Sequence, residues 1–112
     1  MKVLFIPEVV DQFLELAEVL YDKGYLGFKD AAQKYSEQLF RDIHTNLPLK
    51  VKKGAPTYFE RYGNDLLYSA FPRNKQTVWY VFYSVYEVNG ETTYLVRHLT
   101  NNHVISHHLD LD

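Results

Sequence analysis

The chain has 112 residues, of which 46% are hydrophobic and 16% aromatic, and its formal net charge is −2. This composition excludes a disordered chain, and the length predicts a single domain over residues 1–112. The sequence has no cysteine, which excludes disulfides, thiolate metal sites and a cysteine nucleophile. Residues 1–8 are too weakly apolar for a secretory signal and no run is long enough to span a bilayer, so we expect a cytoplasmic protein without a membrane partner.

Two helices are predicted in the first half of the chain. Residues 8–22 carry apolar side chains at helical spacing, and Pro7 suits the first helical position. Residues 28–46 show a second apolar stripe of the same period. Because only residues 24–27 separate the two, we expect an antiparallel helical hairpin.

The second half of the chain changes to the alternation typical of strands. Three strands are predicted, over residues 66–71, 77–88 and 92–100. Asn89 and Gly90 form a strong two-residue hairpin signal between the last two, because both tolerate positive φ. Residues 49–65 are irregular, which is typical of a packed or functional loop. Residues 103–109 fit either a short strand or a helical turn.

This order of elements predicts an α+β domain, in which the helical hairpin packs on one face of an antiparallel sheet of three to four strands. The middle strands are apolar on both faces, which suggests that both faces are covered. The face opposite the helices would carry a groove for any polar chemistry.

Charge is distributed unevenly along the chain. Residues 1–47 hold five basic and eight acidic side chains, whereas residues 48–97 hold seven basic and four acidic ones. A polyanion would therefore prefer the second half, although ordinary surface charge explains the same pattern.

The residues that could line the groove gather late in the sequence. They are Arg73, Lys75, Tyr80, Arg97, His98, Asn101, Asn102, His103, His107 and His108. Cleavage of RNA without a metal needs a base, an acid and cations that hold the phosphate. Histidine can take either proton role, arginine binds phosphate oxygens, and aromatic rings can stack on a base.

Each of these residues also has a structural interpretation. Arg73 and Lys75 fit solvated charges in a turn, and Arg97 fits a structural arginine that pairs with a carboxylate. Trp79 and Tyr80 fit ordinary core aromatics, and His98 fits a core histidine, while an Asn-Asn pair often marks a turn. His103 and His107 have a spacing that suits one helical face, but no glutamate or cysteine accompanies them, so we predict no metal site.

Three strand motifs carry a family resemblance. The segments WYVFY at 79–83, YLVR at 94–97 and NNHV at 101–104, after a helical hairpin, resemble the RelE/ParE toxins of type II toxin–antitoxin systems. The resemblance covers almost the whole chain. It implies either mRNA cleavage in the ribosomal A site without a metal, as in RelE-like members, or poisoning of DNA gyrase, as in ParE-like members. It also implies a cognate antitoxin that wraps the toxin, and a pair that often represses its own operon.

The resemblance places some family positions on this chain. Arg73 matches a basic, phosphate-holding residue at the end of the first long strand. Tyr80 stands where many members have arginine, and residues 100–103 replace a loop that carries lysine and arginine. His107 or His108 falls near a tyrosine that transfers protons in some members.

We therefore expect a metal-independent, ribosome-dependent mRNA endoribonuclease with no cofactor, whose partners are the mRNA–ribosome complex and an antitoxin protein. The expected catalytic residues are Arg73, Arg97, Asn102, His103 and His108. The expected RNA contacts are Lys75, Trp79 and Tyr80. The alternatives are a ParE-like gyrase inhibitor and a catalytically inactive binding or repressor module of the same fold.

Overall fold

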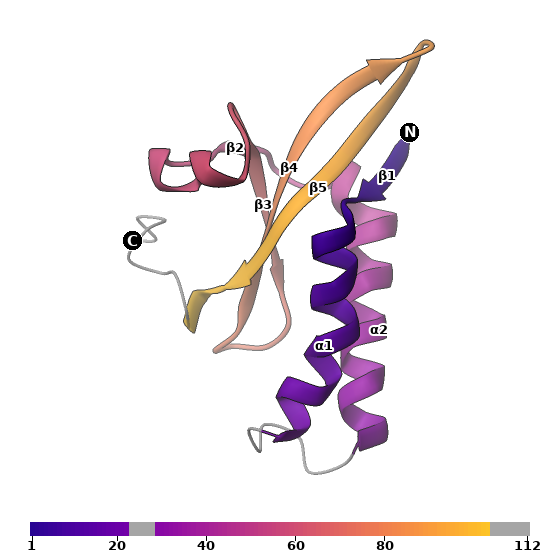
Figure 1. The fold of residues 1–112 in the computed structure, drawn as a ribbon, viewed down its shortest axis with the longest axis vertical. Helices are drawn as coiled ribbons and strands as arrows, with labels where there is room; N and C mark the ends of the chain where they lie inside the picture. The colour runs from indigo at the N-terminus through magenta and orange to yellow at the C-terminus, as the bar shows by residue number, and fades with distance from the viewer. Residues whose placement is uncertain (23–28, 104–112) are drawn as a thin grey trace.

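The computed structural model describes residues 1–22 and 29–103, and Figure 1 shows their arrangement. Two long helices lie along one side of a five-stranded sheet. In chain order the elements are β1 (Lys2–Phe5), α1 (Pro7–Asp22), α2 (Lys29–Asn46), the 3₁₀ helix η1 (Leu47–Leu49), β2 (Lys53–Gly54), the 3₁₀ helix η2 (Thr57–Tyr62), β3 (Leu67–Pro72), β4 (Val78–Val88) and β5 (Glu91–Asn101).

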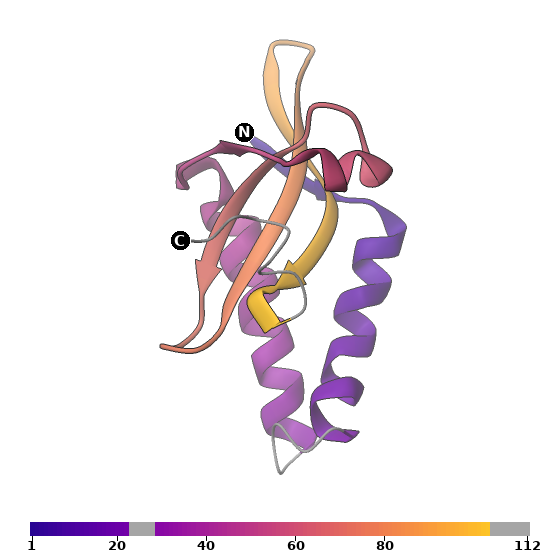
Figure 2. The same ribbon diagram turned by 90° about the vertical axis from the view of Figure 1, so that its left-hand side faces the viewer.

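The helices form where the apolar spacing predicts them, within one residue at each described end. Oγ of Ser36 on α2 donates to the carbonyl oxygen of Phe13 on α1 at 2.8 Å, and the rings of Phe13 and Phe40 meet edge to face. These contacts hold the helices side by side (Figures 1 and 2). The predicted connection at residues 24–27 lies outside the described residues. Neither described helix is long and apolar enough to cross a membrane.

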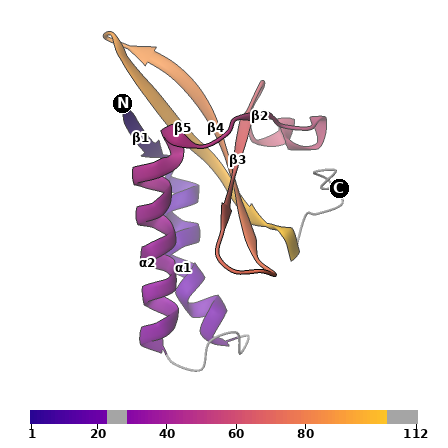
Figure 3. The same cartoon turned by 180° about the vertical axis from the view of Figure 1, so that it is seen from behind.

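The prediction of an antiparallel sheet of three to four strands is wrong, although the α+β class holds. The sheet has five strands in the order β1-β5-β4-β3-β2, and β1 pairs with β5 in parallel (Figure 3). The other three pairs are antiparallel. The two strands that the sequence pattern missed, β1 and β2, have four and two residues, too few to show an alternation.

The three predicted strands are confirmed as β3, β4 and β5, each within one residue of its predicted bounds. Asn89 and Gly90 have φ angles of 52° and 79°, as the predicted two-residue turn requires. Of the predicted segment 103–109, only His103 is among the described residues.

Alternate residues of β4 face the two sides of the sheet. Trp79 and Tyr83 join the core beneath the helices. Tyr80 and Phe82 join a second cluster beneath η2, where the ring of Phe59 stacks on that of Phe82 with 4.2 Å between centroids. The centre of the sheet is therefore covered on both faces, as the two-sided apolar pattern predicts, and its far face is not the open groove that we expected.

Candidate functional site

An arginine, a serine and a tyrosine meet on the sheet face that lies opposite the helices. Nε of Arg97 on β5 donates to Oγ of Ser84 on β4 at 3.1 Å. Nη2 of Arg97 donates to Oη of Tyr86 at 3.0 Å. Tyr86 lies two residues after Ser84 on β4, on the same face of the sheet. We call Arg97, Ser84 and Tyr86 the Arg97 cluster.

A β-bulge aims Arg97 into this cluster. Phe82 pairs with His98 and the next residue, Tyr83, pairs with Val96, so Arg97 has no residue opposite it. Such an extra residue re-aims a side chain and is common next to functional sites. Because of it, Arg97 and His98 both contact groups on the η2 side of the sheet, although neighbours in a regular strand point to opposite faces.

Gly63, which follows η2, packs directly against the arginine. Its φ of 152° is one that L side chains rarely adopt. A Cβ built at this position would lie 3.1 Å from Cδ of Arg97 and 3.2 Å from Cδ2 of Leu66. The absence of a side chain at residue 63 therefore lets the backbone support the Arg97 stem.

The cluster keeps the positive charge of its arginine. Arg97 is half-buried, and none of the ion pairs formed within residues 1–22 and 29–103 includes it. Its two hydrogen-bond partners are hydroxyl groups, which orient the guanidinium without neutralising it. An oriented, unneutralised guanidinium is well suited to bind phosphate or carboxylate oxygens.

Tyr86 adds a group that can exchange a proton. The hydrogen bond from Arg97, with a smaller contribution from Ser84, lowers the pKa of Tyr86 below its usual value of 10.0. Its side chain is 43% exposed, so a ligand can reach it. The cluster thus combines an anion holder with an accessible phenol that ionises more readily than usual.

His98 lies beside the cluster but contributes no charge near neutral pH. Its imidazole stacks on the ring of Tyr62 with 3.7 Å between centroids and 6° between planes. Burial lowers the pKa of His98 to about 4, so the ring is neutral at pH 7. It fits the core histidine that the strand pattern allows.

Arg73 follows β3, where the resemblance places a phosphate-holding residue, but its positive charge is already paired with a carboxylate. Its Nη2 forms an ion pair with Asp42 of α2. Asn46 donates to the other carboxylate oxygen of Asp42 at 2.7 Å. Arg73 therefore ties the sheet to α2 and is not a solvated turn charge.

Asn102 and His103 fasten the end of β5 to the start of β4. The side chain of Asn102 accepts from the backbone N–H of Val78 at 2.9 Å and donates to the carbonyl oxygen of Gln76 at 3.0 Å. His103 Nε2 lies 3.0 Å from Oγ1 of Thr77. Asn102 and His103 lie five and six residues along the chain from Arg97, roughly 16 Å or more at the rise of a strand, so the structure does not bring these expected catalytic residues together with Arg97.

The expected RNA-binding residues lie in three different environments. Trp79 is buried in the helix-side core, where its Nε1 donates to Oη of Tyr35 at 2.9 Å. Tyr80 is buried in the cluster beneath η2, and burial raises its pKa. Lys75 is exposed in the turn between β3 and β4. His107 and His108 lie outside the described residues.

Sequence reasoning missed Ser84 and Tyr86. Both lie in the strand segment TVWYVFYSVYEV, where Tyr86 is one aromatic residue among several and Ser84 is a single polar position. No local signal marks either, because their role depends on a partner from the neighbouring strand. Among the residues that the structure describes, no group of three or more His, Cys, Asp or Glu side chains could hold a metal ion.

Comparison with protein-family models, curated protein sequences and solved structures finds no match to this chain.

Proposed function

We propose that this chain is the toxin of a type II toxin–antitoxin system and a metal-independent endoribonuclease that cleaves mRNA on translating ribosomes. The proposal starts from the RelE/ParE-like strand motifs. It also takes α1 and α2 to form an antiparallel helical hairpin. The observation that carries it is the Arg97 cluster. An arginine that no carboxylate of the described residues neutralises, beside a phenol of lowered pKa, supplies a phosphate-holding cation and one of the two proton-transfer groups that metal-free cleavage of a phosphodiester needs.

In this proposal Arg97 holds the non-bridging oxygens of the scissile phosphate. The hydroxyl groups of Ser84 and Tyr86 keep its guanidinium in one orientation before RNA binds. Tyr86 is the proton-transfer group nearest that phosphate. Of the expected catalytic residues that the structure describes, we assign a catalytic role to Arg97 alone. Arg73 and Asn102 have structural roles in this proposal, because Arg73 pairs with Asp42 of α2 and Asn102 binds the backbone of Val78 on β4.

The test is expression from a tightly controlled promoter, with growth followed and mRNA 5′ ends mapped by primer extension. We expect growth arrest together with new 5′ ends inside codons. The variant Arg97→Gln should abolish both, because it removes the charge that holds the phosphate. Lys34→Ala is the matched control, since it removes one exposed positive charge from α2 and should leave arrest and cleavage unchanged.

A ParE-like gyrase inhibitor is the second candidate, and the ion pair between Arg73 and Asp42 favours it. With Arg73 neutralised by Asp42, the sheet end has less free positive charge for RNA than the sequence suggests. This candidate predicts arrest with a DNA-damage response and without new mRNA ends. Soluble protein without arrest would instead favour the inactive binding or repressor module.

A further inference from the structure

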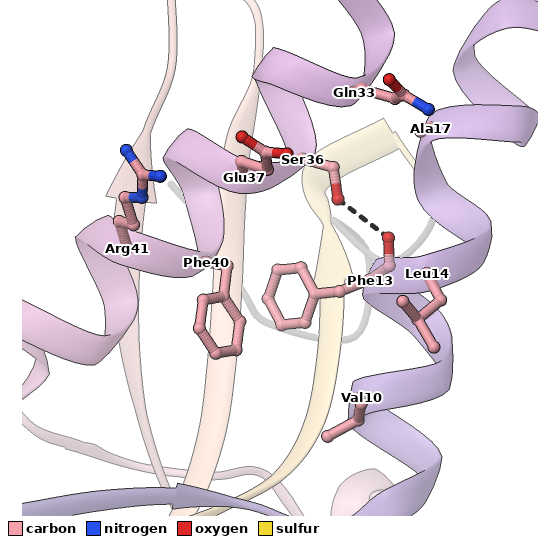
Figure 4. A pocket seen from close by; sticks show the side chains of 9 residues that line it. All are labelled: Val10, Phe13, Leu14, Ala17, Gln33, Ser36, Glu37, Phe40 and Arg41. Atoms are coloured by element: carbon pink, nitrogen blue, oxygen red, sulfur yellow. Dashed lines mark hydrogen bonds between the residues drawn. The ribbon is translucent and has the colours of Figure 1, made fainter.

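A cavity of about 610 Å³ lies between α1 and α2, beside the rings of Phe13 and Phe40 (Figure 4). Its two charged lining residues, Glu37 and Arg41, are of opposite sign, so its charge selects no particular ligand. It also lies on the helix layer, away from the Arg97 cluster. A smaller cavity has a more selective lining, and it lies on the sheet beside that cluster.

Beyond the Arg97 cluster, the face of the sheet opposite the helices is exposed. The last part of β4, from Ser84 to Val88, pairs with β5 alone, and the two strands project as a hairpin (Figure 1). On this face the side chains of Leu4, Tyr86 and Val88 are 48%, 43% and 51% exposed. The cluster is therefore continuous with an accessible, largely apolar surface.

The smaller cavity lies on this surface, next to Tyr86. Its volume is about 210 Å³, and its lining residues are Lys2, Leu4, Val88, Asn89, Glu91 and Thr93. We call it the hairpin pocket. Thr93 is the residue that pairs with Tyr86 across the β4–β5 ladder, so the pocket begins where the Arg97 cluster ends. Because pockets for drug-sized ligands occupy roughly 300–1,000 Å³, this one is of a size for a single ring system.

One carboxylate gives the hairpin pocket its selective chemistry. Glu91 is the first residue of β5, and its side chain is 46% exposed. Its oxygens lie 3.7 Å from Nζ of Lys2 and 3.8 Å from the backbone nitrogen of Met1. Both distances are longer than a hydrogen bond, so each carboxylate oxygen can still accept an N–H group of a ligand.

Two accepting oxygens match a ring edge that presents two N–H donors side by side. Among the RNA bases guanine has such an edge, formed by N1–H and the N2 amino group. The other three bases present an acceptor beside each donor on the same edge, so a carboxylate would repel part of it. The apolar side chains of Leu4 and Val88 can contact the faces of the bound ring.

We propose that the hairpin pocket binds a guanine base of the RNA substrate, with Glu91 as the specificity-determining residue. This inference rests on the proposed nuclease function and adds a sequence preference to it. Val88 lies two residues beyond Tyr86 on the same strand face, roughly 7 Å along the strand. The base of a nucleotide next to the scissile phosphate can therefore reach the pocket while that phosphate stays at Arg97.

The test is a fluorescence anisotropy titration of short fluorescein-labelled RNA strands with the full-length chain. One probe has a single guanosine among uridines, and the other has adenosine at the same position. Both carry 2′-O-methyl ribose, which blocks cleavage through the 2′-hydroxyl. We expect the guanosine probe to bind roughly tenfold more tightly. Equal binding of the two probes, or no binding of either, would overturn the proposal.

Two matched variants place the preference in the hairpin pocket. Glu91→Gln should remove it, because the amide replaces one accepting oxygen with a donor. Glu87→Gln is the control and should keep it. Glu87 lies on the same hairpin, but it alternates with Tyr86 and Val88 and so faces the other side of the sheet, where Thr92 donates to its carboxylate. Each variant removes one negative charge, so a preference lost in both, or kept in both, would refute the site.

Mapping of mRNA 5′ ends separates this inference from the function on which it rests. New ends with guanine enriched beside the cut, and with that enrichment lost in Glu91→Gln, would support both. New ends without such enrichment would refute the pocket and leave the nuclease standing. If no new ends appear but the guanosine probe still binds selectively, the nuclease is refuted and the pocket stands.

Discussion

Nη2 of Arg97 donates a hydrogen bond to the phenolic oxygen of Tyr86 across the β4–β5 ladder, at 3.0 Å. The two residues are eleven positions apart in the chain. This pairing lowers the pKa of Tyr86 and gives Arg97 a polar partner that leaves its charge in place.

Replacing Arg97 should raise the pKa of Tyr86 towards its usual value. In Arg97→Gln the strongest stabilisation of the phenolate is lost, because the hydrogen bond from the guanidinium is the largest cause of the shift. The measurement is an NMR titration of tyrosine Cζ labelled with ¹³C, with Tyr86→Phe used to assign the signal. An unchanged Tyr86 titration in Arg97→Gln would show that the two side chains are not coupled in solution.

Stability should fall as the pH drops below 6.5, because of His98. Its pKa is about 4 in the folded chain and near 6.5 when unfolded, so between these values the unfolded state binds more protons. Stability from this residue is therefore complete above pH 6.5 and is lost as the pH falls towards 4, by up to about 2 kcal/mol once solvent screening of this partly exposed ring is allowed for.

Urea unfolding at pH 4.5 and pH 7.5 measures this difference. His98→Phe should flatten the dependence, since phenylalanine can keep the stack on Tyr62 without titrating. The control is His103→Gln, which removes an exposed histidine near the end of β5. This variant should keep the full pH dependence of stability. Identical pH profiles for His98→Phe and the unmodified chain would contradict the assignment.

The Arg73–Asp42 pair should couple the sheet to α2. Both side chains are about four-fifths buried, with 20% and 22% of their area exposed. A double-mutant cycle of Arg73→Met and Asp42→Asn in urea unfolding should give a coupling free energy of roughly 1 kcal/mol. Additive single effects would mean that the ion pair contributes nothing to stability.

Gly63→Ala should destabilise the fold and disturb the Arg97 cluster. The added Cβ meets Cδ of Arg97 at 3.1 Å, and the positive φ disfavours any side chain, so we expect a loss of about 1–3 kcal/mol. Gly54→Ala is the matched control, because a Cβ at Gly54 meets nothing within 4 Å. Thermal unfolding of the two variants checks the difference, and equal melting temperatures would contradict the tight packing.

The candidate site was predictable only in part. Arg97 is recognisable as a strand arginine, but strict alternation places it on one face with Leu95 and Leu99. The bulge opposite Phe82 and Tyr83 breaks this alternation: Leu99 joins the helix-side core, whereas Arg97 lies on the other face, next to Ser84 and Tyr86. A bulge adds one residue to one strand, and its position depends on the partner strand, so a single-strand pattern cannot reveal it.

The sequence by itself determined the elements whose signals are local. The helical stripes of α1 and α2, the alternation of β3 to β5 and the turn at Asn89 and Gly90 all depend on residues a few positions apart. Only the tertiary structure decided the parallel pairing of β1 with β5, the ion pair between Arg73 and Asp42, and the bulge at Arg97. Each of these joins segments far apart in the chain, and their pairing is selected by packing of the whole domain, which no short-range pattern encodes.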